Sequence, residues 1–109
     1  MHDGNNDKEK RKKVWVINRS AHDFSDAERF GELHYLSNGP IIKTNVVDMD
    51  RQFNAKLEAS SAEDYILPTS LSVMTAIACS IFVLRHRCLN LLLYKNGMYI
   101  ERRLCYKEN

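Results

Sequence analysis

The chain has 109 residues, of which 44% are hydrophobic and 28% are charged, and its formal net charge is +2. This length supports one domain with one hydrophobic core, and the composition is that of an ordinary globular protein. The charge pattern excludes a strongly basic, nucleic-acid-binding body, because residues 1–13 carry the whole net charge of +2 and residues 14–109 are neutral.

The first twelve residues are polar, with Met1 as the one apolar side chain. We expect residues 1–12 to form a disordered basic tail and residues 13–107 to form a single α/β domain. A polar start also lacks the apolar stretch of a signal peptide. Any contact with nucleic acid is expected from this tail alone.

Three cysteines are present at positions 79, 88 and 105, with no Cys-x-x-Cys pair. An odd number of cysteines without metal-ligand spacing argues against a disulfide framework and against a zinc site. We therefore expect a reducing compartment and a cytoplasmic protein, which is the host cytoplasm if the protein is viral.

The first elements are predicted from apolar runs and turn signals. Residues 14–17 form a continuous β-type apolar run, which is typical of a strand buried on both faces. Residues 24–30 are predicted to form a short helix, with Ser25 and Glu28 as a capping box. Residues 32–36 alternate polar and apolar side chains and are predicted to form a less buried strand.

The middle of the chain has the pattern of a helix followed by a strand. Asn45 is expected to cap a helix whose apolar stripe repeats at helical spacing (Val46, Met49, Phe53 and Leu57). The apolar run at residues 65–67 predicts a third strand, which ends at Pro68.

The next helix is predicted to begin at Ser70 or Ser72 and to end near Arg85. It is apolar on nearly every side, which indicates a central helix or one shared with a partner subunit. Residues 66–84 contain no charge and approach the length of a membrane span. Pro68 and five hydroxyl side chains argue against that alternative, so we expect no membrane contact. Because the helix is apolar on nearly every side and the domain is small, we expect a homo-oligomer.

The C-terminal part is predicted to be a β-hairpin. Residues 89–94 form an apolar strand, Asn96-Gly97 is a strong hairpin signal, and residues 98–104 pair back as a charged edge strand. The predicted order is therefore β-α-β-α-β-α-β-β. We expect a small three-layer Rossmann-like α/β sheet, mostly parallel, with a C-terminal antiparallel hairpin strand.

Open parallel sheets bind ligands beyond the carboxyl ends of their strands. The loops at those ends carry the candidate ligand-binding residues Asn18, Arg19, Ser20, His22, Thr69, Ser70 and Ser72. A helix N-terminus near Ser70 favours an anion, although Ser70 as a simple cap explains the same residue. No glycine-rich nucleotide-binding motif is present.

Proton chemistry, if the protein is an enzyme, would fall to His22 and Asp23. A Ser–His–Asp arrangement using Ser70 lacks the Gly-x-Ser-x-Gly elbow. We expect His34 and His86 to be structural. The spacing of Cys, His, Asp and Glu indicates no metal site, and we expect no cofactor.

Five segments carry a resemblance to a known group of proteins: NRSAHDFS at 18–25, FGEL at 30–33, DYIL at 64–67, TSL at 69–71 and LNLLL at 89–93. They resemble small proteins that tailed bacteriophages carry, and the similarity covers residues 14–104. Pro68 and Arg87 depart from that pattern, since another apolar residue is usual at the first position and glycine at the second. The resemblance implies a protein that works inside an infected bacterium, and it implies no catalytic family.

Three functions are consistent with these residues. The first is a non-catalytic binding module for an anionic small molecule such as a nucleotide, which in a phage could sequester a host signalling nucleotide. The second is a hydrolase of nucleotides or phosphate esters that uses His22. The third is an oligomeric structural or interaction protein with no ligand.

Overall fold

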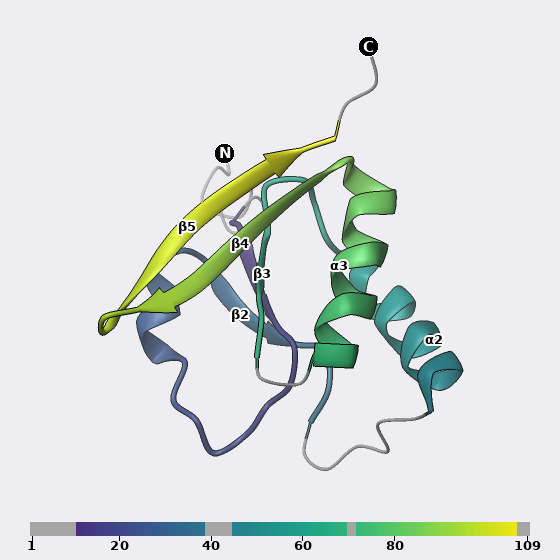
Figure 1. Cartoon of the computed structure of the whole chain (residues 1–109), viewed down its shortest axis with the longest axis horizontal. Helices are drawn as coiled ribbons and strands as arrows, with labels where there is room; N and C mark the ends of the chain where they lie inside the picture. The colour runs from purple at the N-terminus through teal and green to yellow at the C-terminus, as the bar shows by residue number, and fades with distance from the viewer. Residues whose placement is uncertain (1–10, 39–44, 70–71, 107–109) are drawn as a thin grey trace, which may run out of the picture.

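A computed structural model describes residues 11–38, 45–69 and 72–106 of the chain, so the predicted tail falls almost entirely outside the described residues (Figure 1). In chain order the elements are β1 (Lys13–Val16), the 3-10 helix η1 (Ser25–Arg29), β2 (Glu32–Tyr35), α2 (Val46–Leu57), β3 (Tyr65–Leu67), α3 (Ser72–His86), β4 (Cys88–Lys95) and β5 (Met98–Cys105).

The five strands form one sheet in the order β2-β1-β3-β4-β5. The first four strands are parallel, and β5 runs antiparallel to β4. The predicted α/β class, the mostly parallel sheet and the antiparallel C-terminal strand are thus confirmed.

The two faces of the sheet are covered differently. Helices α2 and α3 pack against each other over one face, together with a core that includes Trp15, Ile66 and Phe82. The second face has its own apolar cluster around Val16, and the helical segment there is η1. The three-layer Rossmann-like layout is therefore not confirmed, because a five-residue 3-10 helix extends only roughly 10 Å.

The sheet curls around η1, the short helix on its second face. η1 contacts both β2 and β5, which are the two edge strands. The β4–β5 hairpin accordingly arches over the side of the molecule that holds η1 (Figure 1). The second face is enclosed by the sheet's own curvature rather than by a full helical layer.

The predicted capping box at the start of η1 does not form. Instead, the carboxylate of Asp23 accepts a hydrogen bond of 2.9 Å from the Ser25 backbone N–H. Gly31 follows η1 where the chain passes close to β1. A Cβ atom at this position would lie 2.6 Å from the Lys12 carbonyl oxygen, so the close approach of the two backbones requires glycine.

Helix α2 has the predicted apolar stripe, with Met49, Phe53 and Leu57 all buried. Asn45 occupies the N-cap position, but its side chain makes no capping hydrogen bond. The first turn is supported instead by Asp48, which accepts hydrogen bonds from Arg51 and Gln52.

Two left-handed residues shape the C-terminal hairpin. Asn96 and Gly97 have φ angles of 53° and 83°, which is the combination that a two-residue turn between antiparallel strands requires. Arg87, between α3 and β4, has a φ angle of 59°. Glycine would adopt this left-handed conformation with less strain than arginine.

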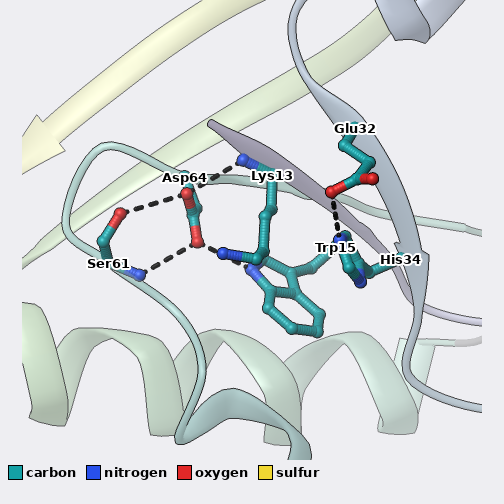
Figure 2. Close-up of polar contacts among 6 residues, drawn as sticks. All are labelled: Lys13, Trp15, Glu32, His34, Ser61 and Asp64. Carbon is teal, nitrogen blue, oxygen red and sulfur yellow. Dashed lines mark hydrogen bonds and ion pairs between the residues drawn. The ribbon is translucent and has the colours of Figure 1, made fainter. Parts of the chain in front are cut away.

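The neighbouring strands β1 and β3 are joined at their starts by one fully buried carboxylate, Asp64. It accepts hydrogen bonds from the Lys13 backbone N–H at 2.9 Å and from the Trp15 indole N–H at 3.0 Å, both on β1. It also accepts hydrogen bonds from the backbone N–H and the hydroxyl of Ser61, in the loop before β3 (Figure 2). A buried carboxylate with four donors is well compensated, and it joins the start of β1 to the start of β3.

We predict that Asp64→Asn lowers the free energy of unfolding by about 2–3 kcal/mol, because an amide group turns a donor toward buried donors and leaves at least one of them unsatisfied. Urea unfolding followed by circular dichroism measures this change. Asp50→Asn is the matched control, since Asp50 is exposed on α2 and its replacement should change stability by less than about 0.5 kcal/mol. Equal stability of the two variants would contradict the role given to Asp64.

Candidate functional site

The strand order creates one place where neighbouring loops separate. β1 lies between β2 and β3, so the chain leaves β1 toward one side of the sheet and leaves β3 toward the other. Such a switch in direction opens a crevice beyond the carboxyl ends of the two strands, and open α/β sheets bind their ligands there.

A pocket of about 460 Å³ lies at this position. Its lining comes from the segment after β1, from the end of β3 and from the hairpin: Asn18, Ser20, His22, Phe24, Leu67, Pro68, Thr69, Leu92, Leu93, Tyr94 and Tyr99. We call it the switch-point pocket. Its volume lies within the range of small-molecule sites in proteins.

The inner wall of the pocket is apolar and aromatic. Phe24, Leu67, Leu92 and Tyr99 are buried and belong to the cluster on the second face of the sheet. Tyr99 meets Tyr94 edge to face, with ring centroids 5.1 Å apart. Burial raises the pKa of Tyr99, and the neighbouring Tyr94 adds to that effect, so this phenol stays neutral.

Polar groups lie along the side formed by the segment after β1. Asn18 is 9% exposed, and its Oδ1 lies 2.7 Å from the Ser37 hydroxyl, which also approaches the Ile17 carbonyl oxygen. Within the described residues the Asn18 amide nitrogen makes no hydrogen bond. Asn18 is therefore held in place by Ser37 and retains donors for a ligand.

His22 stands at the exposed rim. Its backbone N–H donates to the Ser20 hydroxyl at 3.2 Å, and its ring lies against Phe24 with the centroids 5.0 Å apart. No carboxylate is hydrogen-bonded to the His22 ring in the part of the chain that the structure describes. The geometry thus presents an aromatic, hydrogen-bonding group rather than an oriented acid–base pair.

The structure brings four of the predicted binding residues together in this lining: Asn18, Ser20, His22 and Thr69. Ser70 lies outside the described residues. Ser72 begins α3, but its side chain is not among the described groups.

Arg19 and Asp23 stand apart from the pocket lining. The Arg19 guanidinium lies over the Tyr35 ring, 5.1 Å from its centroid, and the Arg19 backbone pairs with Asn38. The Asp23 carboxylate accepts a hydrogen bond from the Ser25 backbone N–H. This bond, together with one from the Ser25 side chain, lowers the pKa of the Asp23 carboxyl group. Among the described residues, the lining therefore contains no lysine, arginine or carboxylate.

Sequence reasoning missed the hairpin side of the pocket. Tyr94 and Tyr99 are cross-strand partners on either side of the Asn96-Gly97 turn, and that pairing was the one available signal. It did not reveal that the hairpin arches back toward the segment after β1.

The two histidines expected to be structural lie away from the pocket lining. His34 Nε2 lies 3.1 Å from the Glu32 carboxylate, and this hydrogen bond lowers the pKa of Glu32 (Figure 2). The His34 ring also lies against the Trp15 ring. His86 bonds Ser60 at 2.8 Å, and burial lowers the pKa of its ring. The described residues contain no group of three His, Cys, Asp or Glu side chains that could hold a metal ion.

The charge-free run at 66–84, weighed above as a membrane span, is divided between β3 and α3. Among the described helices none has both the length and the hydropathy needed to cross a bilayer.

The fold and the site define a small α/β protein with an aromatic-lined pocket at a switch point of a curled sheet. Residues 5–104 match the model of the phage Pam3 gp32-like protein family, so the chain belongs to that family. This membership confirms the resemblance to phage proteins. No curated protein and no solved structure matches the chain.

Proposed function

We propose that this chain is a non-catalytic binding module for a small molecule that carries a planar ring, such as a nucleotide, and that the ligand occupies the switch-point pocket. The observation that carries the proposal is the lining itself, which pairs aromatic and aliphatic side chains with a few fixed polar groups at the switch point of the sheet.

The aromatic groups favour a ring over a flexible chain. Tyr94 is 60% exposed and stands beside the buried Tyr99, while Phe24 also lines the pocket and has the His22 ring against it. Stacking on such side chains tolerates every nucleobase, because each base has a π-face. Asn18 supplies the hydrogen-bond donors that would orient the ring edge.

The lining also bears on where an anionic group would lie. Because the part of the pocket wall that the structure describes has no lysine or arginine, a phosphate is better placed at the open rim, where His22 and Ser20 can donate to it and water can solvate it. The proposal therefore puts the ring inside and the anion outside. It favours a ligand with one phosphate over a polyphosphate.

Membership of a phage protein family suggests that this binding takes place in an infected bacterium. A phage protein that holds a nucleotide without converting it would act by sequestering a host signalling molecule in the cytoplasm of the infected cell. The His22 hydrolase has less support, since Asp23 is bonded to Ser25 and lies outside the lining.

We predict that freshly purified protein releases a ring-containing compound on denaturation, and that a nucleoside monophosphate binds the emptied protein. Tyr94→Ala should weaken that binding about tenfold, because loss of one stacking partner costs roughly 1–3 kcal/mol. Mass spectrometry of the extract and isothermal titration calorimetry make the two measurements.

Tyr106→Ala is the matched control, because Tyr106 is also an exposed tyrosine but lies at the far end of β5, outside the pocket lining. Its affinity should equal that of the unchanged protein. A clean extract together with no heat of binding for any nucleoside monophosphate would overturn the proposal, as would equal affinities of the two variants.

The homo-oligomer remains a separate proposal. Helix α3 exposes Val73 and Leu84, the latter 78% exposed, and the hairpin exposes Leu93, Met98 and Leu104. A domain of this size buries a modest share of its surface alone, so a second copy covering these side chains would add to its stability.

We predict a dimer or larger species by multi-angle light scattering, which Leu84→Asp shifts toward monomer. Val47→Asp is the control, since Val47 is a similarly exposed apolar residue on α2. A monomer at every concentration tested would refute self-association.

A further inference from the structure

Two of the three cysteines face each other across the β4–β5 hairpin. Cys88, the first residue of β4, is the register partner of Cys105, the last residue of β5. The sequence separates them by a complete hairpin, and the absence of any Cys-x-x-Cys pattern hides the relation. All three cysteines are free thiols in this structure.

Both ends of the hairpin indicate that Cys88 and Cys105 form a non-hydrogen-bonded pair of the β4–β5 ladder. Near the root of the hairpin, the Tyr106 backbone N–H donates to the Arg87 carbonyl oxygen at 2.8 Å, which makes the neighbouring pair Cys88–Cys105 a non-hydrogen-bonded one. At the other end, the two-residue turn is closed by Lys95 and Met98. Alternation along the ladder from that closing pair gives the same assignment.

Non-hydrogen-bonded partners bring their Cα atoms to about 4.5 Å, and their side chains project from the same face of the sheet. A disulfide requires Cα atoms roughly 4.4–6.8 Å apart, so this backbone spacing already satisfies the bond. Closing it calls for rotation of the two side chains, with no change of register.

The surroundings of the two thiols suit them to different roles. Cys105 is exposed, whereas Cys88 is buried and donates from its Sγ to the Ala62 carbonyl oxygen at 3.5 Å. The exposed Cys105 is therefore the thiol that a reagent can reach first.

We propose that Cys88 and Cys105 form a cross-strand disulfide when the protein meets a small-molecule disulfide such as oxidised glutathione. The Cys105 thiolate attacks one sulfur of the reagent, and a first small thiol leaves. Cys88 then loses its proton and attacks the Cys105 sulfur of the mixed disulfide, which releases the second small thiol. Two protein thiols are oxidised and one reagent disulfide is reduced.

The bond would clamp the root of an edge hairpin. It would close a loop that contains all of β4 and β5, while the Ala62 carbonyl oxygen would keep its 2.7 Å hydrogen bond from Asn90. Since Tyr94 and Tyr99 stand at the opposite end of the hairpin, oxidation should stabilise the domain and leave the switch-point pocket unchanged.

The test is to incubate the folded full-length chain with oxidised glutathione and to measure the intact mass without reductant. The expected product is a monomer lighter by two hydrogen atoms, with tryptic peptides 88–95 and 104–107 linked. Cys79→Ser should give the same product, because Cys79 lies on α3 and burial raises the pKa of its thiol. Cys88→Ser should stop at the glutathione adduct on Cys105.

A stable glutathione adduct on the unchanged protein, a bond to Cys79, a disulfide-linked dimer or no reaction would each overturn the proposal. As a second measurement, the thermal midpoint of the oxidised form should lie about 10 °C above that of the reduced form. A lower midpoint after oxidation would contradict the stated geometry, because it would reveal strain in the closed bond.

Discussion

The buried carboxylate of Asp64 is the contact on which the arrangement of the sheet depends. It takes two donors from β1 and two from Ser61, and its own backbone carbonyl oxygen accepts from the Asn90 side chain on β4. Three neighbouring strands are therefore tied to the loop at 61–64. The four donors to the carboxylate offset the cost of burying it, so the amino-terminal ends of β1 and β3 are held together.

At the carboxyl ends of β1 and β3 the chain takes two different directions, because the two strands are tied together at their starts. With β1 and β3 fixed at their starts, their parallel register carries Val16 and Leu67 to the same level, and the chain then departs in two directions. The short η1 leaves room on that face, and the curled hairpin closes it with Tyr94 and Tyr99. The switch-point pocket is thus a consequence of strand order, of the reduced helix after β1 and of sheet curvature acting together.

Sequence patterns predicted what depends on local periodicity and missed what depends on tertiary register. β1, the stripe of α2 and the Asn96-Gly97 turn follow from short-range rules and were found. The predicted capping box does not form because the Ser25 backbone N–H, from which the Glu28 side chain would have accepted a hydrogen bond, donates to Asp23 instead. Arg19 was expected near a ligand, yet it stacks on Tyr35, a contact set by the pairing of β2 with β1. Asp64 had no pattern to mark it, since a single acidic residue before a strand is common at the surface.

The most direct test of the central claim, that the switch-point pocket is a ligand site, is a titration of the ¹⁵N-labelled protein with a nucleoside monophosphate, followed by amide chemical-shift mapping. We predict that the largest shifts fall on Asn18, His22, Thr69, Tyr94 and Tyr99, while the amides of α2 stay unchanged. Shifts confined to α2 or to the outer face of α3, or no shifts at millimolar ligand, would contradict it.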